Sequence, residues 1–373
     1  MLRHRLLSLS ITFPLVLAAC NGADRLAAPP ATADRFGAAT AVVPSDGSIQ
    51  AAIDAAAPGA VILISSGTYR EAITVAKAGI KLVGRGDVTI ENPGDAEDGI
   101  SVSDAGDGFA LVNVTVRGFE ENGVLLAGVD GFLLSNVRAV DNGEYGLFPV
   151  FSSHGVIERC RASGHSDTGI YVGQSHHVAI LGSVASGNVN GIEIENSSDV
   201  QALGNETFDN VAGFLVVLLP GLDVKTSANI LVAGNRVHDN NHVNFAEPGE
   251  IESFVPSGSG ILVVGTDRTT VSANVVTGNA FTGIAVGSTL LLGALAGLPP
   301  EAFADIEPNP DGTRIVGNVA TGNGTASPIP FLPGVDLLWD GTGTRNCWER
   351  NRYGSSYPAS LPRCDLMWQS PPK

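Results

Sequence analysis

Gly123-Val-Leu-Leu opens a series of short glycine-led segments that recur along the chain. The later members are Gly146-Leu-Phe-Pro, Gly169-Ile-Tyr-Val, Gly191-Ile-Glu-Ile, Gly213-Phe-Leu-Val, Gly260-Ile-Leu-Val and Gly283-Ile-Ala-Val. The first four intervals are 23, 23, 22 and 22 residues. A repeat of this length indicates a solenoid, in which one unit buries its apolar face only against the next unit.

Two further positions recur in each unit, and asparagine is the commonest residue at both. The first series is Asn136, Cys160, Ser183, Asn205, Asn235, Asn274 and Asn318. The second series follows five or six residues later and is Asn142, His165, Asn188, Asn210, Asn240, Asn279 and Asn323. Three short β-branched runs per period, separated by bend residues, predict an all-β fold, a right-handed single-stranded parallel β-helix. Residues at equal offsets from the repeated glycine should lie one above another, about 4.8 Å apart.

Both ends of the repeat region carry candidate caps. Residues 48–57 start with Ser48 and have helical spacing, which predicts a helix over the N-terminal end. Cys347 and Cys364 lie in an aperiodic tail, and we predict that they form a disulfide closing a C-terminal cap. Since no linker interrupts the repeats, we predict one β-helix domain over 41–351 and a cap tail over 352–373. Cys160 is expected to be a buried free thiol.

The first residues have the pattern of an export signal. Met-Leu-Arg-His-Arg is basic, Leu6–Leu17 is short and apolar, and Leu17-Ala-Ala-Cys20 ends the run. This pattern predicts a signal peptide over 1–19 rather than a membrane span. Leu17–Cys20 resembles a bacterial lipobox, which implies a lipid on Cys20 and a place in the cell envelope, at the outer membrane or in the periplasm of a Gram-negative host. Residues 20–40 predict a flexible tether.

The chain is acidic, with 21 Lys and Arg against 38 Asp and Glu and a formal net charge of −17. This charge makes nucleic acid an unsuitable partner. It also disfavours an anionic polymer such as a polyuronate unless a divalent cation bridges the two. We expect a monomer whose partner is a polysaccharide or an envelope protein.

Polar and aromatic residues gather at the outward positions of three neighbouring units. Glu193 and Glu195 alternate with the inward Ile192 and Ile194, and Asp167 lies near the same edge. Carboxylates at close range can split their pKa values, so these three are the candidate catalytic residues. The candidate substrate-binding residues are Tyr171, Tyr145, Phe148, Gln174 and Asn196. We expect this face to be exposed, and the alternative is an ordinary solvated strand face.

Three insertions interrupt the later units, at Leu219–Ser227, Asn241–Ser259 and Gly287–Thr313. Long excursions on a solenoid often wall a binding face. The third insertion is too apolar for a free loop, and we expect it to fold over the outside of the coil.

A second stack combines histidine with aspartate. The alignment places Asp130, His154, His177 and Asp199 over four successive units, and these are candidate metal ligands for a divalent cation. His176 should alternate to the other side. The alternative is an exposed ladder that holds no metal. His165 is expected to be a core histidine that bonds its stacked neighbours.

The start of the solenoid carries a family resemblance. Ile49-Gln-Ala-Ala-Ile-Asp, Pro58-Gly59-Ala-Val-Ile-Leu-Ile and Gly67-Thr-Tyr resemble the opening of pectin-lyase-like and NosD-type β-helix proteins, and the resemblance extends to about Asn351. It implies the fold but not the activity, because the superfamily includes lyases, epimerases, hydrolases and non-catalytic proteins. The Asp-Pro-His-Asp motif of alginate epimerases is missing. The two methionines, Met1 and Met367, argue against a thioether copper site.

The sequence leaves three functions open. The first is a lipid-anchored protein that binds a polysaccharide on the outer face and that, if it is an enzyme, acts on it as a hydrolase, lyase or epimerase. The second is a non-catalytic envelope scaffold. The third is periplasmic metal handling.

Overall fold

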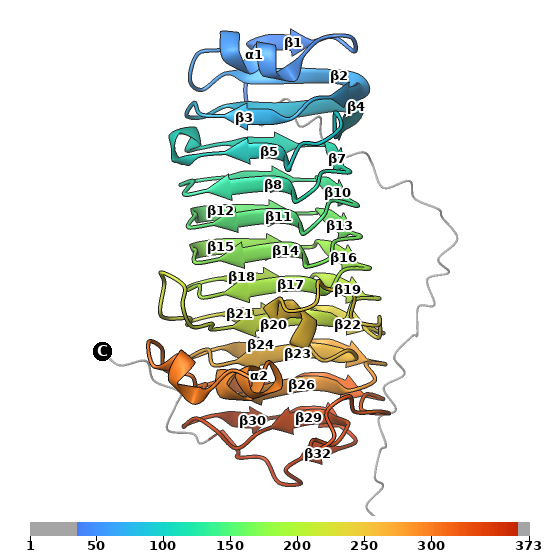
Figure 1. Cartoon of the computed structure of the whole chain (residues 1–373), viewed down its shortest axis with the longest axis vertical. Helices are drawn as coiled ribbons and strands as arrows, with labels where there is room; N and C mark the ends of the chain where they lie inside the picture. The colour runs from blue at the N-terminus through green and yellow to red at the C-terminus, as the bar shows by residue number, and fades with distance from the viewer. Residues whose placement is uncertain (1–35, 365–373) are drawn as a thin grey trace, which may run out of the picture.

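The computed structural model describes residues 36–364, which form the predicted parallel β-helix. Its coils stack along one long axis from β1 to β32 (Figure 1). One side is an 11-stranded parallel sheet. Its strands are β3 (Ile73–Val75), β5 (Asp98–Val102), β8 (Asn122–Ala127), β11 (Tyr145–Val150), β14 (Thr168–Gly173), β17 (Asn190–Glu195), β20 (Ala212–Val217), β23 (Ser259–Val264), β26 (Thr282–Gly287), β29 (Val335–Trp339) and β32 (Ser356–Tyr357).

The other sides of the coil are formed by 21 further strands. In each regular coil, one of these strands ends before the bend that carries the first asparagine series. The next strand begins after that bend. They are β1 (Ala41–Val43), β2 (Val61–Arg70), β4 (Lys81–Glu91), β6 (Ala110–Val112), β7 (Thr115–Arg117), β9 (Leu133–Ser135), β10 (Arg138–Val140), β12 (Ser153–Glu158), β13 (Arg161–Ser163), β15 (His176–Leu181), β16 (Val184–Ser186), β18 (Gln201–Leu203), β19 (Glu206–Phe208), β21 (Leu231–Ala233), β22 (Arg236–His238), β24 (Thr270–Ser272), β25 (Val275–Thr277), β27 (Arg314–Val316), β28 (Val319–Thr321), β30 (Cys347–Glu349) and β31 (Arg352–Tyr353).

The repeated glycines are needed because successive coils approach closely. A Cβ atom on Gly191 would lie 2.7 Å from the carbonyl oxygen of Gly213 in the next coil. The residue after each glycine points inward, and the stacked residues Leu147, Ile170 and Ile192 are fully buried. The register of β14 on β17 places Tyr171 opposite Glu193 and Gly173 opposite Glu195, as the glycine alignment predicts.

The second asparagine series forms a continuous buried ladder. Asn188 Nδ2 donates to Asn210 Oδ1 at 3.0 Å, and Asn210 Nδ2 donates to Asn240 Oδ1 at 2.8 Å. His165 takes part in this ladder, as predicted. Its Nδ1 lies 2.8 Å from Asn188 Oδ1, and its Nε2 lies 3.2 Å from Asn142 Nδ2.

The first series is also a ladder, with one correction. Asn205 and Asn235 bond in the same way as the second ladder, and Cys160 is buried in line with them. Asn136, however, is an exposed residue with φ of 54° that bonds Asn113, while its neighbour Val137 is fully buried. The assignment of Asn136 to the buried ladder is therefore wrong by one position.

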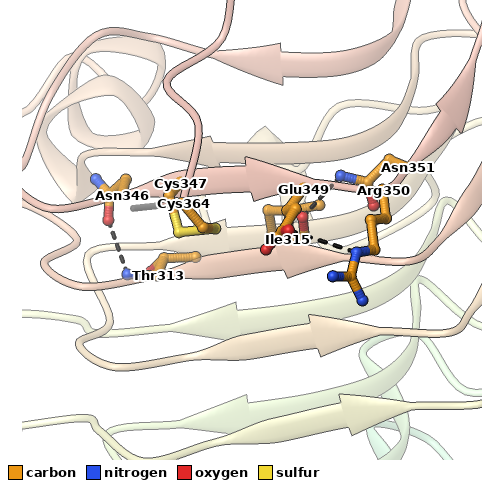
Figure 2. Close-up of a disulfide and its surroundings, with 8 residues drawn as sticks. All are labelled: Thr313, Ile315, Asn346, Cys347, Glu349, Arg350, Asn351 and Cys364. Carbon is orange, nitrogen blue, oxygen red and sulfur yellow. Dashed lines mark hydrogen bonds and ion pairs between the residues drawn. A yellow bond between two sulfur atoms is a disulfide. The ribbon is translucent and has the colours of Figure 1, made fainter. Parts of the chain in front are cut away.

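Both predicted caps are present. Helix α1 (Ile49–Ala55) covers the N-terminal end, and its N-cap Ser48 accepts a hydrogen bond from the backbone N–H of Ala51. At the other end Cys347 and Cys364 form the predicted disulfide, with Cα atoms 4.8 Å apart (Figure 2). In the same close-up the side chain of Asn346 accepts from the backbone N–H of Thr313 and continues the bend of the coil. Parallel pairing continues past residue 351, through β31 and β32.

The third insertion folds over the outside of the coil, as expected. It contains α2 (Thr289–Leu295) and a 3-10 helix (Pro300–Phe303), and α2 lies across the 11-stranded sheet near β26 (Figure 1). Leu292 packs in an outer apolar cluster with Leu215 and Leu262. Two more 3-10 helices lie at Asp104–Gly106 and, in the second insertion, at Ile251–Phe254. None of the helices in residues 36–364 is long and apolar enough to cross a membrane.

Candidate functional site

A cleft of about 380 Å³ lies over the middle of the 11-stranded sheet. Strands β11, β14 and β17 form its floor, and the first two insertions form its opposite wall. Its lining residues are Glu144, Tyr145, Phe148, Val150, Ser166, Asp167, Tyr171, Gln174, Glu195, Leu219, Leu222, Ala246, Glu247, Glu250, Ile251 and Glu252. Two of the three insertions thus wall this face of the sheet.

The expectation that this face is exposed is wrong. Glu193 is 1% exposed, Glu195 7%, Asp167 8% and Tyr171 5%. The cause is tertiary, because residues of both insertions lie across the strands and remove these side chains from water. Asp167 and Glu195 still line the cleft, whereas Glu193 lies beneath it and does not.

Three aromatic rings pack together on the floor. Tyr145 and Phe148 stack with ring centroids 4.2 Å apart and planes 8° apart. Tyr171 meets Phe148 at 4.7 Å and donates a hydrogen bond from its hydroxyl to Glu195 Oε2, 2.8 Å away. Gly173 leaves the space that this contact needs, since a Cβ there would lie 2.0 Å from the Tyr171 hydroxyl oxygen.

Two buried carboxyl groups share one hydroxyl. Thr168 Oγ1 lies 2.8 Å from Asp167 Oδ1 and 2.6 Å from Glu193 Oε2. A hydroxyl has one proton to donate, so the two contacts are both hydrogen bonds only if one of the carboxyl groups is protonated and donates to Thr168. Asn190 Nδ2 also donates to Glu193 Oε2, at 3.1 Å.

Burial sets the protonation of this cluster. It raises the pKa of Glu193 and of Asp167 well above their ordinary values, and the neighbouring carboxylates add to both shifts. Burial also raises the pKa of Glu195, to about 7, although the Tyr171 hydrogen bond opposes the shift. Glu195 can therefore hold or release a proton near neutral pH.

The mouth of the cleft is acidic as well. Glu144, Glu247 and Glu250 are exposed, and Glu252 lies half-buried between the mouth and the floor. Burial and the charge of Glu250 and Glu144 raise the pKa of Glu252, and the negative charge of Glu252 in turn raises the pKa of Asp167.

Two of the predicted substrate-binding residues have structural tasks. Asn196 is fully buried; its Nδ2 donates to the carbonyls of Leu219 and Val224, and its Oδ1 accepts from the Leu219 N–H. Its assignment as a substrate-binding residue is corrected, because it anchors the first insertion. Gln174 lines the cleft but also accepts a hydrogen bond from the Val224 N–H.

Sequence reasoning missed Glu252 and the roles of Thr168 and Asn190. The offset from the repeated glycine was a usable signal for Thr168 and Asn190, since both directly precede it and stack in register. Nothing in the repeat could place Glu252, because an insertion has no register with the coils.

The histidine stack is present on another side of the coil and differs in detail. His154 and His177 stack with centroids 5.1 Å apart, and Asp130 Oδ1 lies 2.6 Å from His154 Nδ1. Asp130 pairs in register with Ser153, so its predicted offset is wrong by one residue.

Two other members of that prediction also change. Asp199 aligns with His177 in the next coil, but its Oδ1 accepts a hydrogen bond from Asn229 Nδ2. His176 does not point away, since its Nδ1 lies 2.9 Å from His177 Nδ1. Within residues 36–364, no three His, Cys, Asp or Glu side chains converge so as to hold a metal ion.

Comparison with known proteins agrees with the architecture. The family model described as right handed beta helix region matches residues 68–219, and that described as periplasmic copper-binding protein (NosD) matches residues 152–290. The chain is a right-handed parallel β-helix protein with the pectin-lyase-like fold. A search of curated protein sequences gave no significant match.

Solved structures share this fold at low identity. The A-module of mannuronan C-5 epimerase AlgE4 from Azotobacter vinelandii is 18% identical, with a TM-score of 0.64 over 86% of this chain and 87% of that chain. The A-module of AlgE6 from the same organism is 19% identical, with a TM-score of 0.58 over 87% and 96%. The periplasmic alginate epimerase AlgG is 14% identical, with a TM-score of 0.52 over 86% and 87%.

Proposed function

We propose that this protein binds a polysaccharide in the cleft and that Glu195 acts on it as a general acid or base. One observation carries the proposal. Glu195 is nine-tenths buried and bonds Tyr171 through Oε2, while its Oε1 has no hydrogen-bond partner among the described residues and its carboxyl group lines a cleft with an aromatic floor. Sugar rings stack on such aromatic faces. The names of the fold neighbours, a mannuronan epimerase and an alginate epimerase, support a polysaccharide as the ligand.

We propose different roles for the carboxyl groups of Glu195, Asp167 and Glu193. A group with a pKa near the working pH is the most effective proton carrier, and Glu195 meets this condition. Asp167 is the second carboxyl group that reaches the cleft, and it supplies the complementary proton. Glu193 is a positioning residue: it bonds Thr168 from below and does not meet the substrate.

A screen of the mature protein on a glycan array, followed by turnover assays of every glycan that binds, tests this function. Binding together with turnover that depends on Glu195 supports it. Binding without turnover would favour the non-catalytic scaffold.

We also propose that the protein is lipid-anchored through Cys20, which lies outside the described residues. The Leu17–Cys20 pattern supports this proposal. Wild-type protein should fractionate with membranes, and Cys20→Ala should remain as an uncleaved or mislocalised precursor, as seen by fractionation and by the mass of the mature chain. Wild-type protein found free in the periplasm would contradict the anchor.

A second candidate function is metal handling at the surface histidines. It is favoured by the grouping of His154, His176 and His177, whose ring centroids lie 5.1 to 5.8 Å apart. These rings are on the surface, so rotation of their side chains can bring several nitrogens onto one ion. Asp130 would orient His154 through its hydrogen bond.

Zinc or copper is then expected to raise the melting temperature, because a ligand that prefers the folded state stabilises it. His177→Ala should abolish the rise, and His242→Ala, which changes an exposed histidine of the second insertion, should retain it. An equal metal-induced rise in the His177 variant would remove this cluster from consideration.

A further inference from the structure

The charges around the cleft restrict the kind of glycan that it can take. Six carboxyl groups line it, and the lining contains no lysine, arginine or histidine; they belong to Glu144, Asp167, Glu195, Glu247, Glu250 and Glu252. Within residues 36–364, no ion pair involves the three at the mouth, Glu144, Glu247 and Glu250. No ion pair with a cationic side chain of the described residues therefore offsets their negative charge.

This negative charge acts on the groups themselves. The pKa of Glu144 is raised by burial first and then by the charges of Glu121, Glu247 and Glu250. A glycan that carries carboxylates would add to the same repulsion. A glycan that carries positive charge would relieve it and would form charge-assisted hydrogen bonds with the mouth.

A second observation points to a hydrogen-bond donor. Glu195 is 7% exposed, and its Oε1 lacks a partner in the described part of the chain although Oε2 is bonded to Tyr171. Oε1 is not one of the fully buried side-chain atoms that lack a partner, so it is open to the cleft and can accept a hydrogen bond from a ligand. The cleft thus offers acceptors at its mouth and on its floor, beside the stacked rings of Tyr145 and Phe148.

We infer that the ligand is a glycan whose sugar units carry free protonated amines, an inference that rests on the proposed polysaccharide function. The sugar ring lies on the aromatic floor, and the ammonium groups lie against Glu144, Glu247 and Glu250 at the mouth. Uronate polymers, the substrates named for the fold neighbours, are excluded by charge unless a cation accompanies them.

Calorimetric titration of the full mature protein with four ligand solutions tests the inference. They are a fully de-N-acetylated β-linked glucosamine tetramer, the N-acetylated tetramer, and a mannuronate tetramer with and without calcium. We expect the free-amine tetramer to bind about tenfold more tightly than the acetylated one at low salt, since two or three exposed ion pairs amount to about 1.4 kcal/mol. Added salt should reduce this preference.

Variants locate the effect. The double substitution Glu247→Gln and Glu250→Gln should lose most of the preference for the amine, and Asp87→Asn, an exposed carboxylate on β4, should keep it. A preference unchanged in the double variant would place the amine elsewhere and overturn the inference.

The remaining outcomes distinguish failure of this inference from failure of the proposed polysaccharide function on which it rests. If the acetylated tetramer binds as tightly as the amine tetramer, or more tightly, when the two compete, the inference is overturned. Polysaccharide binding would then still stand. Tightest binding of mannuronate in calcium would overturn it in favour of a cation-bridged uronate. Failure of every tetramer and of the glycan array to bind would overturn the proposed function itself.

Discussion

Glu195→Gln is expected to lower the turnover of the glycan substrate about a hundredfold or more, the usual effect of removing a general acid or base. The substitution keeps the size of the side chain and can still accept the hydrogen bond from Tyr171. Binding should therefore change much less than turnover. Steady-state and single-turnover rates of the wild-type and variant proteins on the same glycan measure the effect, with Asp87→Asn as the control.

The same substitution should stabilise the fold above neutral pH. Burial raises the pKa of Glu195 from 4.5 to about 7, so the folded state binds an extra proton between these values. The wild-type protein has the full benefit of this proton below pH 4.5 and loses it as the pH rises through 7. The glutamine variant should match the wild type at pH 4.5 and exceed it at pH 8 by up to about 3 kcal/mol in the free energy of unfolding.

A residue whose replacement lowers activity and raises stability is one that serves catalysis at a cost in stability. Denaturant unfolding at several pH values gives the stability difference independently of any substrate. Unchanged turnover in Glu195→Gln would reject the acid/base role. A stability difference that does not grow with pH would show that the carboxyl group is not held in the protonated form.

His165→Asn is expected to remove part of the acid sensitivity of the fold. Burial lowers the pKa of His165 to about 4, so the folded state keeps the imidazole neutral. In that form Nδ1–H donates to Asn188 Oδ1 and Nε2 accepts from Asn142 Nδ2, which reproduces the donor and acceptor of an asparagine in the ladder.

The sign follows from proton binding. The unfolded chain protonates His165 near pH 6.5 and the folded chain only near pH 4, so the unfolded state binds more protons between these values. The wild-type protein therefore loses about 3 kcal/mol of stability from this residue as the pH falls from 6.5 to below 4. The asparagine variant should lack this loss. Its smaller side chain can add a cost, but that cost is independent of pH.

Urea unfolding of the two proteins between pH 4 and pH 8 measures the difference, and the contributions of all other titrating groups cancel in the comparison. His242→Asn, which changes an exposed histidine of the second insertion, serves as the control. A constant stability difference across this range would contradict a neutral ladder histidine.

The sequence determined the features that repeat. The glycine spacing predicted the parallel coils and the register that places Tyr171 opposite Glu193. Stacked strands lie a fixed distance apart, so residues at equal offsets from the repeated glycine become neighbours. The ladder role of His165 followed from its offset. The N-terminal helix and the disulfide of Cys347 with Cys364 followed from local signals at the ends of the repeats.

Only the tertiary structure decided which of the aligned residues can meet a substrate. Insertions have no register with the coils, so the sequence could not show that they bury Glu193 and Glu195 or that Asn196 is used to anchor one of them. It also could not place Glu252 in the same cleft as Asp167. Burial depends on contacts between segments far apart in the chain, and burial is what moves the pKa of a carboxyl group toward neutrality.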